Sequence, residues 1–379
     1  MTIPVFDGHN DFLLRLSRSP HRRDALWLDG TDEGHLDLPR MKTGRFAGGL
    51  FAVFVPSGTD GAAQDSQDRA MDSPPYDQPL DACVSLDRAL PAALGMAADL
   101  FWMERASAGQ FRICRNAAEL RECLARGIIA GVLHMEGAEA IDPEVQVLEA
   151  FHALGLRSLG PVWSRPNAFG HGVPFRFPSG PDTGPGLTGA GRRLVAECNR
   201  LRILIDLSHL NEAGFNDVAK LSDAPLVATH SGAHAITASS RNLTDRQLAM
   251  IAERKGMVGV NFATIFLRRD GRRSPEMGWS PLLRHLEHLI NRLGEDHVGF
   301  GSDFDGTTIP ASIGDVTGLP ALQAALRAHG YDTALLRKLC HANWLDVLER
   351  TWGGQGQATV RPGSSMPAGR DCPGQGHRR

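Results

Sequence analysis

The sequence predicts a single (β/α)8 barrel of the TIM type with insertions at its rim, and two observations carry this prediction. Eight short apolar, mostly β-branched runs alternate with helix-like segments, as in a parallel sheet that is wrapped by helices. Several of these runs end abruptly in His, Glu or Asp, and the active sites of such barrels lie at the carboxyl ends of the strands. The length of 379 residues also accommodates a barrel of about 250 residues plus insertions. We therefore expect one barrel over residues 1–352, followed by a tail.

The predicted elements follow from hydrophobic periodicity and from capping residues. Strands of a buried parallel sheet are short apolar runs, and they are expected at residues 3–7, 48–55, 128–135, 156–162, 203–207, 226–229, 257–261 and 298–301. Apolar residues that recur every three or four positions predict helices at residues 85–108, 117–126, 143–154, 187–200, 211–221, 244–253 and 281–293. Asn116 and Thr244 are the expected N-caps of two of these helices.

Four stretches have the composition of loops. Residues 17–43 are polar and predict a long loop, and residues 56–82, rich in Gly, Asp, Ser and Pro, predict an excursion at the barrel rim. Residues 163–186 are rich in proline, and a loop of this length after a strand is more often functional than idle. The Gly-, Pro- and Ser-rich tail, residues 353–379, buries too little apolar surface to offset its ordering entropy, so we expect it to be disordered.

The composition argues against several classes of function. The 40 basic and 43 acidic residues give a net charge of −3, which does not indicate nucleic acid or an anionic membrane as a partner. No run of about 18 apolar residues appears, so no membrane span is expected. The six cysteines form no C-x-x-C pair, and the first predicted strand begins where a secretory leader would be. These features predict a cytoplasmic protein with reduced thiols.

Five residues at the ends of predicted strands are candidate metal ligands. His9 and Asp11 stand two positions apart, which puts both side chains on the same side of an extended backbone. Glu136, His209 and His230 end or follow later apolar runs. Imidazole and carboxylate without thiolate suit Zn²⁺ or a similar divalent ion, and five ligands suit two ions that share a carboxylate. We assign His9 and Asp11 to one ion. His209 and His230 go to the other, with Glu136 shared by both.

Asp303 follows the eighth apolar run and is the expected catalytic acid/base. Two metal ions about 3.5–4 Å apart can hold a water between them and lower its pKa toward neutrality, which makes hydroxide available as a nucleophile. Asp303 would orient that hydroxide and pass its proton to the leaving amine.

Six short runs, in order and spacing, resemble the motifs of the membrane (renal) dipeptidase family, peptidase family M19 of the amidohydrolase superfamily. They are Asp-Gly-His-Asn-Asp at 7–11, Glu-Gly at 136–137, Ser-His at 208–209, Thr-His-Ser at 229–231, Ser-Ser-Arg-Asn at 239–242 and Gly-Ser-Asp-Phe-Asp-Gly at 301–306. The resemblance implies a binuclear zinc dipeptidase in which Asp303 is the acid/base and Arg241 binds the substrate carboxylate. A guanidinium fork binds a carboxylate in bidentate fashion, so the role of Arg241 also has a physical basis.

One position departs from the pattern of this family. In its animal members a Thr-His pair ends the fourth strand, and that imidazole helps to polarise the scissile carbonyl. Trp163 stands at the corresponding place here. His171, which lies between two glycines in the following loop, and Asn167 are the candidates to supply the missing donor. We expect Trp163, Asn167 and His171 to contact substrate, and the departure concerns the substrate range more than the metal centre.

The predicted function is that of a metal-dependent dipeptidase. It would cleave short peptides that have a free carboxyl terminus, including those with a D-residue at that end, as the resemblance implies. An N-acyl amino acid deacylase, or another amide hydrolase on the same two-metal site, is the alternative. A non-catalytic metal-binding or scaffold protein is a third hypothesis, which the complete ligand set and Asp303 argue against. The expected partner is a small dipeptide, and a homodimer is the assembly considered.

Other polar residues near these runs have structural interpretations. His134 is interpreted as a hydrogen-bonded barrel histidine, and His341 as part of the capped start of the last helix. His234 is interpreted as either a pocket-wall or a structural residue. We expect Asp305 to cap the segment that follows it and Asp206 to pair with a neighbour inside the barrel.

Overall fold

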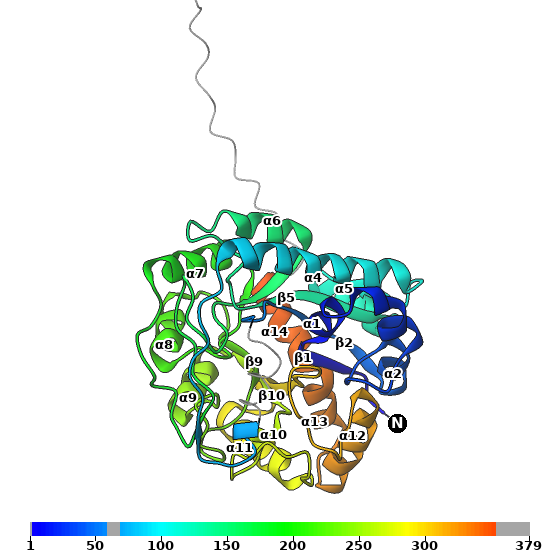
Figure 1. Cartoon of the computed structure of the whole chain (residues 1–379). Coiled ribbons are helices and arrows are strands. Elements are labelled where there is room, and N and C mark those ends of the chain that lie inside the picture. Colours follow the sequence, from blue (N-terminus) through cyan, green and yellow to red (C-terminus); the bar gives the residue numbers. More distant parts are fainter. Residues whose placement is uncertain (1, 59–68, 354–379) are drawn as a thin grey trace, which may run out of the picture.

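The computed structural model describes residues 2–58 and 69–353 and shows a nearly closed barrel of eight parallel strands (Figure 1). The strands lie in the order β8-β6-β5-β2-β1-β11-β10-β9, and a parallel bridge between Asp206 and Val227 joins β8 to β9. Their bounds are β1 Val5–Asn10, β2 Phe46–Phe54, β5 Ile129–Glu136, β6 Leu156–Gly160, β8 Leu204–Ile205, β9 Val227–Ser231, β10 Met257–Asn261 and β11 Val298–Gly301. Each matches one of the eight predicted runs, so the predicted fold class is confirmed.

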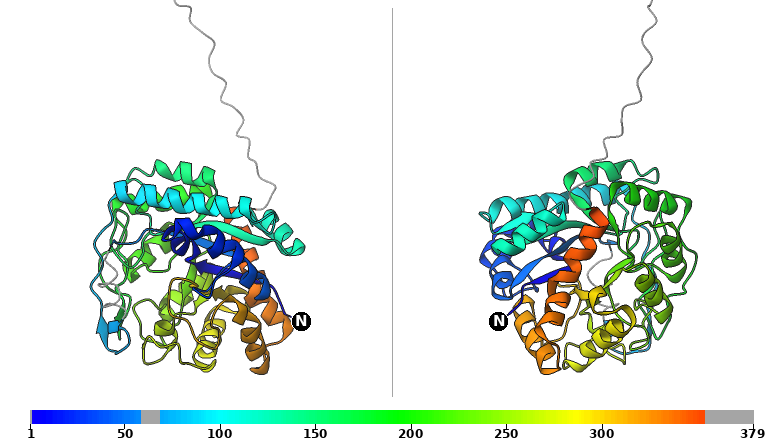
Figure 2. Two further views of the ribbon diagram at one scale, coloured as in Figure 1. Left: turned by 45° about the vertical axis from the view of Figure 1, so that its right-hand side comes forward. Right: turned by 180° about the vertical axis from the view of Figure 1, so that it is seen from behind.

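Helices cover the outside of the barrel, as Figures 1 and 2 show. The α-helices are α1 Phe12–Ser17, α2 Leu38–Thr43, α4 Leu86–Ala106, α5 Ala117–Arg126, α6 Val147–Leu154, α7 Gly189–Leu201, α8 Glu212–Leu221, α9 Asp245–Glu253, α10 Thr264–Leu267, α11 Ser280–Leu293, α12 Leu319–Ala328, α13 Thr333–Arg337 and α14 Asn343–Trp352. Short 3-10 or π turns are η1 Pro20–Arg22, η2 Ala25–Asp29, η3 Glu295–His297, η4 Val316–Gly318 and η5 Lys338–Ala342. The side chains of Asn116 and Thr244 cap α5 and α9, as predicted.

Residues 17–43 do not form the long loop that their polar composition predicts. They contain η1, η2 and α2, and the Asp37 side chain caps α2 by accepting a hydrogen bond from Arg40 N at 2.7 Å. Trp27 of η2 is fully buried and donates its indole N–H to Ser107 Oγ at 2.8 Å. Contacts such as these anchor the segment, and they give no periodic pattern in sequence.

Two further element predictions need correction. The helix predicted from residue 143 begins only at Val147, because Val145 has a φ of 66° and the Asp142 carboxylate binds the N–H groups of Gln146 and Val147. The prediction also lacks β4, Phe111–Ile113, which pairs with β5. The start of α6 depends on local turn chemistry, and β4 has only three residues, so hydrophobic periodicity predicts neither.

Helix α14 closes the mouth of the barrel that lies opposite the carboxyl ends of the strands (Figure 2, view from behind). Its Trp344 is fully buried and donates its indole N–H to Phe300 O at 2.9 Å. A Cβ atom at Gly8 would lie 2.3 Å from the Trp344 ring, so glycine makes room for the indole. His341 contacts Pro4 O at 2.9 Å, a structural role, but it lies within η5, which runs directly into α14 without a cap.

The rim carries a small antiparallel sheet of β3 (Tyr76–Asp77) and β7 (Arg176–Phe177). Both strands fall in stretches that the sequence predicts to be irregular.

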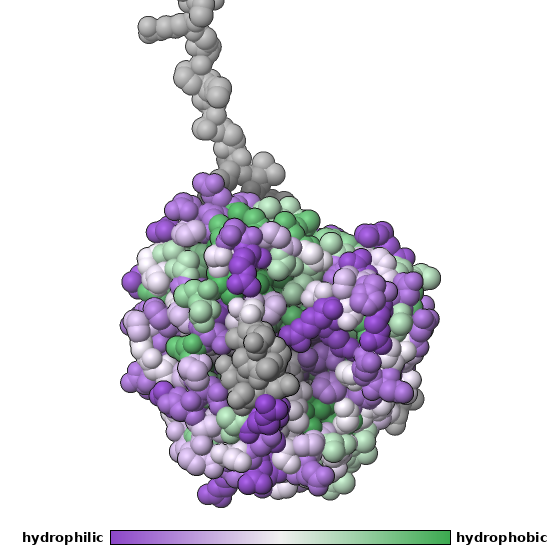
Figure 3. Space-filling view, in the orientation of Figure 1, coloured by the Kyte–Doolittle hydropathy of each residue, from purple (hydrophilic) through white to green (hydrophobic). Residues whose placement is uncertain are grey.

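Part of the predicted excursion, residues 59–68, and the predicted disordered tail from residue 354 onward lie outside the described residues. Within the described ranges, none of the helices is long and apolar enough to cross a membrane. Hydrophilic residues predominate on the face seen in Figure 3.

Candidate metal centre and active site

Five buried side chains meet at the carboxyl ends of the barrel strands. Glu136, the last residue of β5, lies at the centre of the cluster: its Oε1 is 3.0 Å from His209 Nε2 and 3.3 Å from His230 Nε2. His9 of β1 also approaches this oxygen: its Nε2 is 3.7 Å from Glu136 Oε1 and 3.5 Å from Asp11 Oδ2. All five residues are at most 5% exposed. The structure therefore brings the five predicted ligands together at one mouth of the barrel.

Asp303 joins this cluster through an unusual backbone turn. The φ angle is 59° at Asp303 and 67° at His209, in the left-handed region that non-glycine residues uncommonly adopt. Asp303 N donates to His9 O at 3.0 Å, which ties the turn after β11 to β1. Asp303, His9 and Asp11 each have one potential metal-ligating atom within 4.8 Å of those of the other two. The predicted acid/base therefore lies beside the predicted ligands.

Two residues that were not predicted to belong to the site orient these groups through hydrogen bonds. Ser164 Oγ lies 2.8 Å from His209 Nδ1, and Asn261 Nδ2 donates to Asp303 Oδ2 at 2.9 Å. Asn261 is the last residue of β10. Its position at the carboxyl end of a strand is a signal that could have identified it, because the other site residues share that position.

The charges of the cluster favour a bound cation. Burial raises the pKa of Glu136 well above its ordinary value and raises that of Asp303 to about 6. Burial alone would lower the pKa of His9, but Glu136, Asp11 and Asp303 outweigh it and raise that pKa to about 10. Three carboxylates thus favour a positive charge at the position of His9.

The other two imidazoles are held neutral. Burial lowers the pKa of His209 and of His230 well below the ordinary value, and the positive charges of Arg241 and His9 act in the same direction. Neutral imidazole is the form that binds metal ions. Both His209 and His230 are therefore uncharged near neutral pH, as metal binding requires.

The hydrogen-bond pattern of the cluster also fits a metal site. Both ring nitrogens of His9 and Oδ1 of Asp11 are buried and have no hydrogen-bond partner among residues 2–58 and 69–353. Buried polar atoms without partners are uncommon because they lose their hydration without compensation. Metal coordination by imidazole nitrogen and carboxylate oxygen would satisfy them, and such a donor set suits zinc or a similar divalent ion.

Arg241 places a guanidinium group next to the cluster. The side chain is 4% exposed, Nη2 donates to His230 O at 3.1 Å, and the guanidinium carbon lies 5.3 Å from the centre of the Phe266 ring. Its Nε has no hydrogen-bond partner in the described part of the chain. A buried cation with an N–H group to spare is suited to bind an anionic group of a substrate.

Trp163 forms an aromatic wall beside the cluster. The centre of its ring lies 5.8 Å from that of His209, 5.0 Å from that of Phe54 and 5.5 Å from that of Phe175. The Arg165 guanidinium lies 5.4 Å from the centre of the Trp163 ring. Trp163 therefore presents an apolar surface at the place where the resemblance to the dipeptidase family would lead one to expect an imidazole.

Asn167 and His171 make contacts within their own loop. Asn167 Nδ2 donates to Pro161 O at 2.8 Å, and its Oδ1 accepts from Phe169 N at 2.9 Å. His171 Nδ1 lies 3.2 Å from Gly186 O. The structure thus gives both residues a role in shaping the loop, and their contact with substrate, like that of Trp163, stays a prediction.

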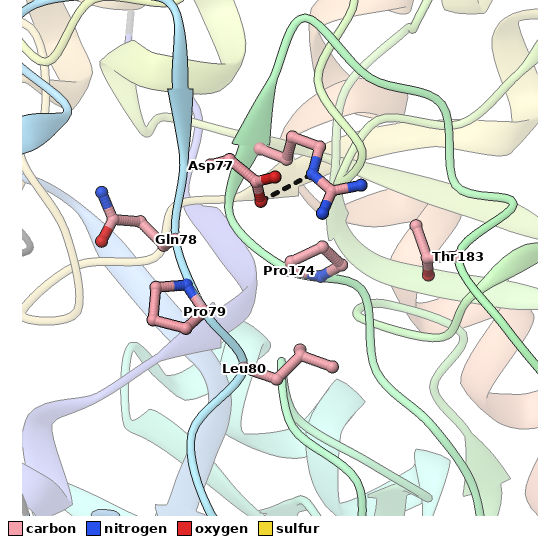
Figure 4. Close-up of a pocket in the computed structure, with 7 residues that line it drawn as sticks. Asp77, Gln78, Pro79, Leu80, Pro174 and Thr183 are labelled. Carbon is pink, nitrogen blue, oxygen red and sulfur yellow. Dashed lines mark ion pairs between the residues drawn. The ribbon is translucent and has the colours of Figure 1, made fainter.

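A pocket of about 400 Å³ lies at the rim, next to the small sheet (Figure 4). Its lining residues are Asp77, Gln78, Pro79, Leu80, Pro174, Arg176 and Thr183. Arg176 Nε lies 2.6 Å from Asp77 Oδ1, which joins β7 to β3. None of the five clustered residues lines this pocket, so it is distinct from the candidate metal centre.

The residues with structural interpretations have the following contacts. His134 Nδ1 lies 2.9 Å from Ser158 Oγ, and His234 Nε2 lies 3.0 Å from Ser179 O, which supports a structural role for both. The expectation for Asp305 is wrong, because its carboxylate accepts from His35 N at 2.6 Å and so binds an earlier loop and not the following segment.

A TIM-type barrel with buried histidines and carboxylates at the carboxyl ends of its strands defines a class, the metal-dependent hydrolases. The family described as membrane dipeptidase, peptidase family M19, matches residues 1–355. The chain belongs to this family. The resemblance read from the sequence motifs is thereby confirmed.

Two solved structures and one curated protein are similar to this chain. A metallo peptidase from Rhodobacter sphaeroides, liganded with a phosphinate mimic of the dipeptide L-Ala-D-Ala, is 69% identical, with a TM-score of 0.92 over 93% of this chain and 100% of that chain. A dipeptidase AC, described as a metallo peptidase of family M19, is 68% identical, with a TM-score of 0.91 and the same coverage. An uncharacterized protein encoded in the pqqA 5' region of Klebsiella pneumoniae is 49% identical over 262 residues, 67% of this chain and 97% of that protein.

Proposed function

We propose that this chain is a binuclear zinc dipeptidase that cleaves short peptides with a free carboxyl terminus. The observation that carries the proposal is the convergence of Glu136 Oε1 on three imidazole nitrogens, at 3.0, 3.3 and 3.7 Å, with the Arg241 guanidinium beside them. The Rhodobacter sphaeroides relative, which is liganded with a mimic of L-Ala-D-Ala, supports dipeptides with a C-terminal D-residue as substrates.

In this proposal each ligand has the role expected from the sequence. His9 and Asp11 would hold one ion and His209 and His230 the other. Glu136 would serve both, because its Oε1 lies within 3.7 Å of all three imidazoles. Bound divalent ions would lower the pKa of a water molecule between them and so supply hydroxide near neutral pH.

The chain's own residues then position the peptide and move protons. Asp303 takes a proton from the attacking water and delivers it to the leaving nitrogen, a role that suits a carboxylate whose pKa burial raises to about 6. Arg241 binds the terminal carboxylate through its free Nε–H and so places the scissile bond at the cluster. The Trp163 ring excludes water from one side of the site.

The proposal is tested with purified protein, metal analysis and a substrate panel. The panel contains L-L and L-D dipeptides, L-Ala-D-Ala among them, and the N-acetyl forms of the same C-terminal residues. We expect two zinc ions per chain and hydrolysis of dipeptides with little turnover of the acyl amino acids. Preferred turnover of acyl amino acids would favour the deacylase, and no turnover of either class by zinc-loaded protein would favour a non-catalytic role.

A further inference from the structure

Asp206 lies next to the candidate metal centre, with its Oδ2 3.9 Å from His230 Nδ1, at the seam where the barrel closes. It follows β8, is 1% exposed, and forms the bridge with Val227 that joins β8 to β9. Its Oδ1 accepts hydrogen bonds from Ser208 N at 3.0 Å and Thr229 N at 2.8 Å. Its Oδ2 accepts from the Thr229 hydroxyl at 2.6 Å.

These contacts determine which way the Thr229 hydroxyl donates. A carboxylate can only accept, so the hydroxyl hydrogen points at Asp206. Thr229 Oγ1 also lies 2.8 Å from His230 Nδ1 and must therefore accept from Nδ1–H. The proton of the neutral His230 ring is thus placed on Nδ1, and the lone pair remains on Nε2, the atom that faces Glu136 Oε1 at 3.3 Å.

The Asp206 carboxylate also lies near His134, the residue whose ring packs against His9. Asp206 Oδ2 lies 3.7 Å from His134 Nε2, and the His134 ring packs edge-on against the His9 ring with their centres 5.3 Å apart. Both rings are fully buried. One carboxylate therefore lies behind two of the predicted ligands, one from each half of the cluster.

We infer that Asp206 is a positioning residue that holds His230 in its ligating tautomer through the Thr229 hydroxyl and thereby sets the affinity of the site for a divalent cation. The inference rests on the proposed metal centre. Groups that orient ligating histidines in this way typically contribute 10–100-fold to metal affinity. The expectation that Asp206 pairs with a neighbour inside the barrel is thus extended to a role in metal binding.

Asp206→Asn tests the inference because it reverses the direction of this hydrogen-bond chain. The amide oxygen must take the place of Oδ1, where two backbone N–H groups donate, so the amide NH₂ takes the place of Oδ2. The Thr229 hydroxyl then accepts from the amide and donates to His230 Nδ1. That forces the His230 proton onto Nε2 and blocks the nitrogen that would bind metal.

The experiment measures zinc affinity of the full chain by competition with a chromogenic chelator. The proteins are wild type, Asp206→Asn, Thr229→Ser, Thr229→Val and the double variant Asp206→Asn/Thr229→Val. Thr237→Val is the matched control, because Thr237 is also fully buried with its hydroxyl 3.2 Å from a histidine nitrogen, that of His285, outside the cluster. Thermal unfolding of the metal-free proteins reports any general loss of stability.

We expect Asp206→Asn to weaken the binding of one zinc ion by about 10–100-fold, and Thr229→Ser and Thr237→Val to leave zinc affinity near the wild-type value. In the Thr229→Val background, which lacks the relaying hydroxyl, Asp206→Asn should have a much smaller effect. Equal losses in both backgrounds would overturn the inference and leave Asp206 a role at the barrel seam only.

The remaining outcomes are also decisive. If Asp206→Asn does not fold, the pair Thr229→Ser and Thr229→Val replaces it: retained affinity in the first and loss in the second support the relay, and equal affinities overturn it. Wild-type protein that binds two zinc ions tightly, with an Asp206→Asn variant that does the same, refutes the inference alone. Wild-type protein that binds no zinc refutes the proposed metal centre itself.

Discussion

Asp303 has one carboxylate oxygen held by Asn261 Nδ2 at 2.9 Å, in a turn that places the group beside His9 and Asp11. Asp303→Asn keeps the shape of the side chain and removes its capacity to take up a proton. We expect kcat to fall by about 10²–10⁴-fold while zinc content, measured by elemental analysis, stays at the wild-type value. Loss of metal from this variant would identify Asp303 as a ligand and not as the acid/base.

Arg241 offers a direct test of substrate binding. Arg241→Ala removes the charged donor for a terminal carboxylate, and a hydrogen bond to a charged group contributes about 1.5–3 kcal/mol. We therefore expect KM for a dipeptide to rise about 10–100-fold, with a much smaller rise for the same dipeptide amidated at its carboxyl terminus. Steady-state kinetics on the two peptides measure the ratio, and an equal rise in both would remove the proposed role. Arg241→Lys, which keeps the charge and loses the fork, should lie between.

At the scale of residues, the site residues that lie in or at the ends of strands could be predicted from the sequence. His9, Glu136 and His230 were predictable because each stands in or at the end of an apolar run, and the barrel brings such ends together. Ser164 and Asp206 were not predictable as supports of the site, because their importance lies in single hydrogen-bond directions. Such directions depend on side-chain positions that sequence spacing does not determine.

At the scale of elements, glycine in β10 sets how closely two strands approach. A Cβ atom at Gly259 would lie 2.0 Å from Thr229 O in β9, an overlap that only a backbone shift can relieve. We expect Gly259→Ala to lower the free energy of unfolding by roughly 1–3 kcal/mol, measured by urea unfolding. It should also weaken zinc binding, since Thr229 precedes His230.

The matched control for this strand variant is Gly95→Ala in helix α4. A Cβ atom at Gly95 has no neighbour within 4 Å in the described structure, and the residue is exposed. Alanine is favoured over glycine inside a helix, so this variant should gain roughly 0.5–1 kcal/mol of stability. Equal effects of the two substitutions would contradict the steric argument for Gly259.

The strands and the capped helices were predictable, whereas the irregular elements were not. The apolar runs predict the bounds of β10 and β11 correctly at both ends, because buried parallel strands need a continuous apolar surface. The start of α6 and the elements between residues 17 and 43 depend on specific side-chain contacts of Asp142, Asp37 and Trp27. Such contacts leave no periodic pattern in the sequence, so these boundaries appear only in the structure.

At the scale of the whole molecule, the barrel was predictable because strand and helix alternation leaves few topologies. The details of the seam were not predictable, since β8 has two residues and its link to β9 depends on the Asp206–Val227 bridge. The cytoplasmic location and the homodimer stay predictions, and cell fractionation and light scattering measure them directly.

Stability of the whole fold should depend on pH through His285, a fully buried residue of α11. Its Nδ1 accepts from Ala233 N at 2.9 Å, so the folded protein requires the neutral ring at that atom. Burial lowers the pKa of His285 to about 3, whereas an unfolded histidine has a pKa near 6.5. Between these values the unfolded chain binds one more proton than the folded chain, so stability from this group is full above pH 6.5 and falls as the pH is lowered toward 3.

For one proton, the free energy of unfolding changes by about 1.4 kcal/mol per pH unit, which amounts to about 2 kcal/mol between pH 6.5 and pH 5. His285→Gln keeps an acceptor for Ala233 N and a donor for Thr237 but does not titrate in this range. We therefore expect metal-free wild-type protein to lose about 2 kcal/mol more than the variant over this interval, measured by urea unfolding at both pH values. Because every other titrating group is common to both proteins, the difference between the two losses isolates His285. Parallel pH dependence in the two proteins would show that His285 is protonated in the fold, against the hydrogen bond from Ala233.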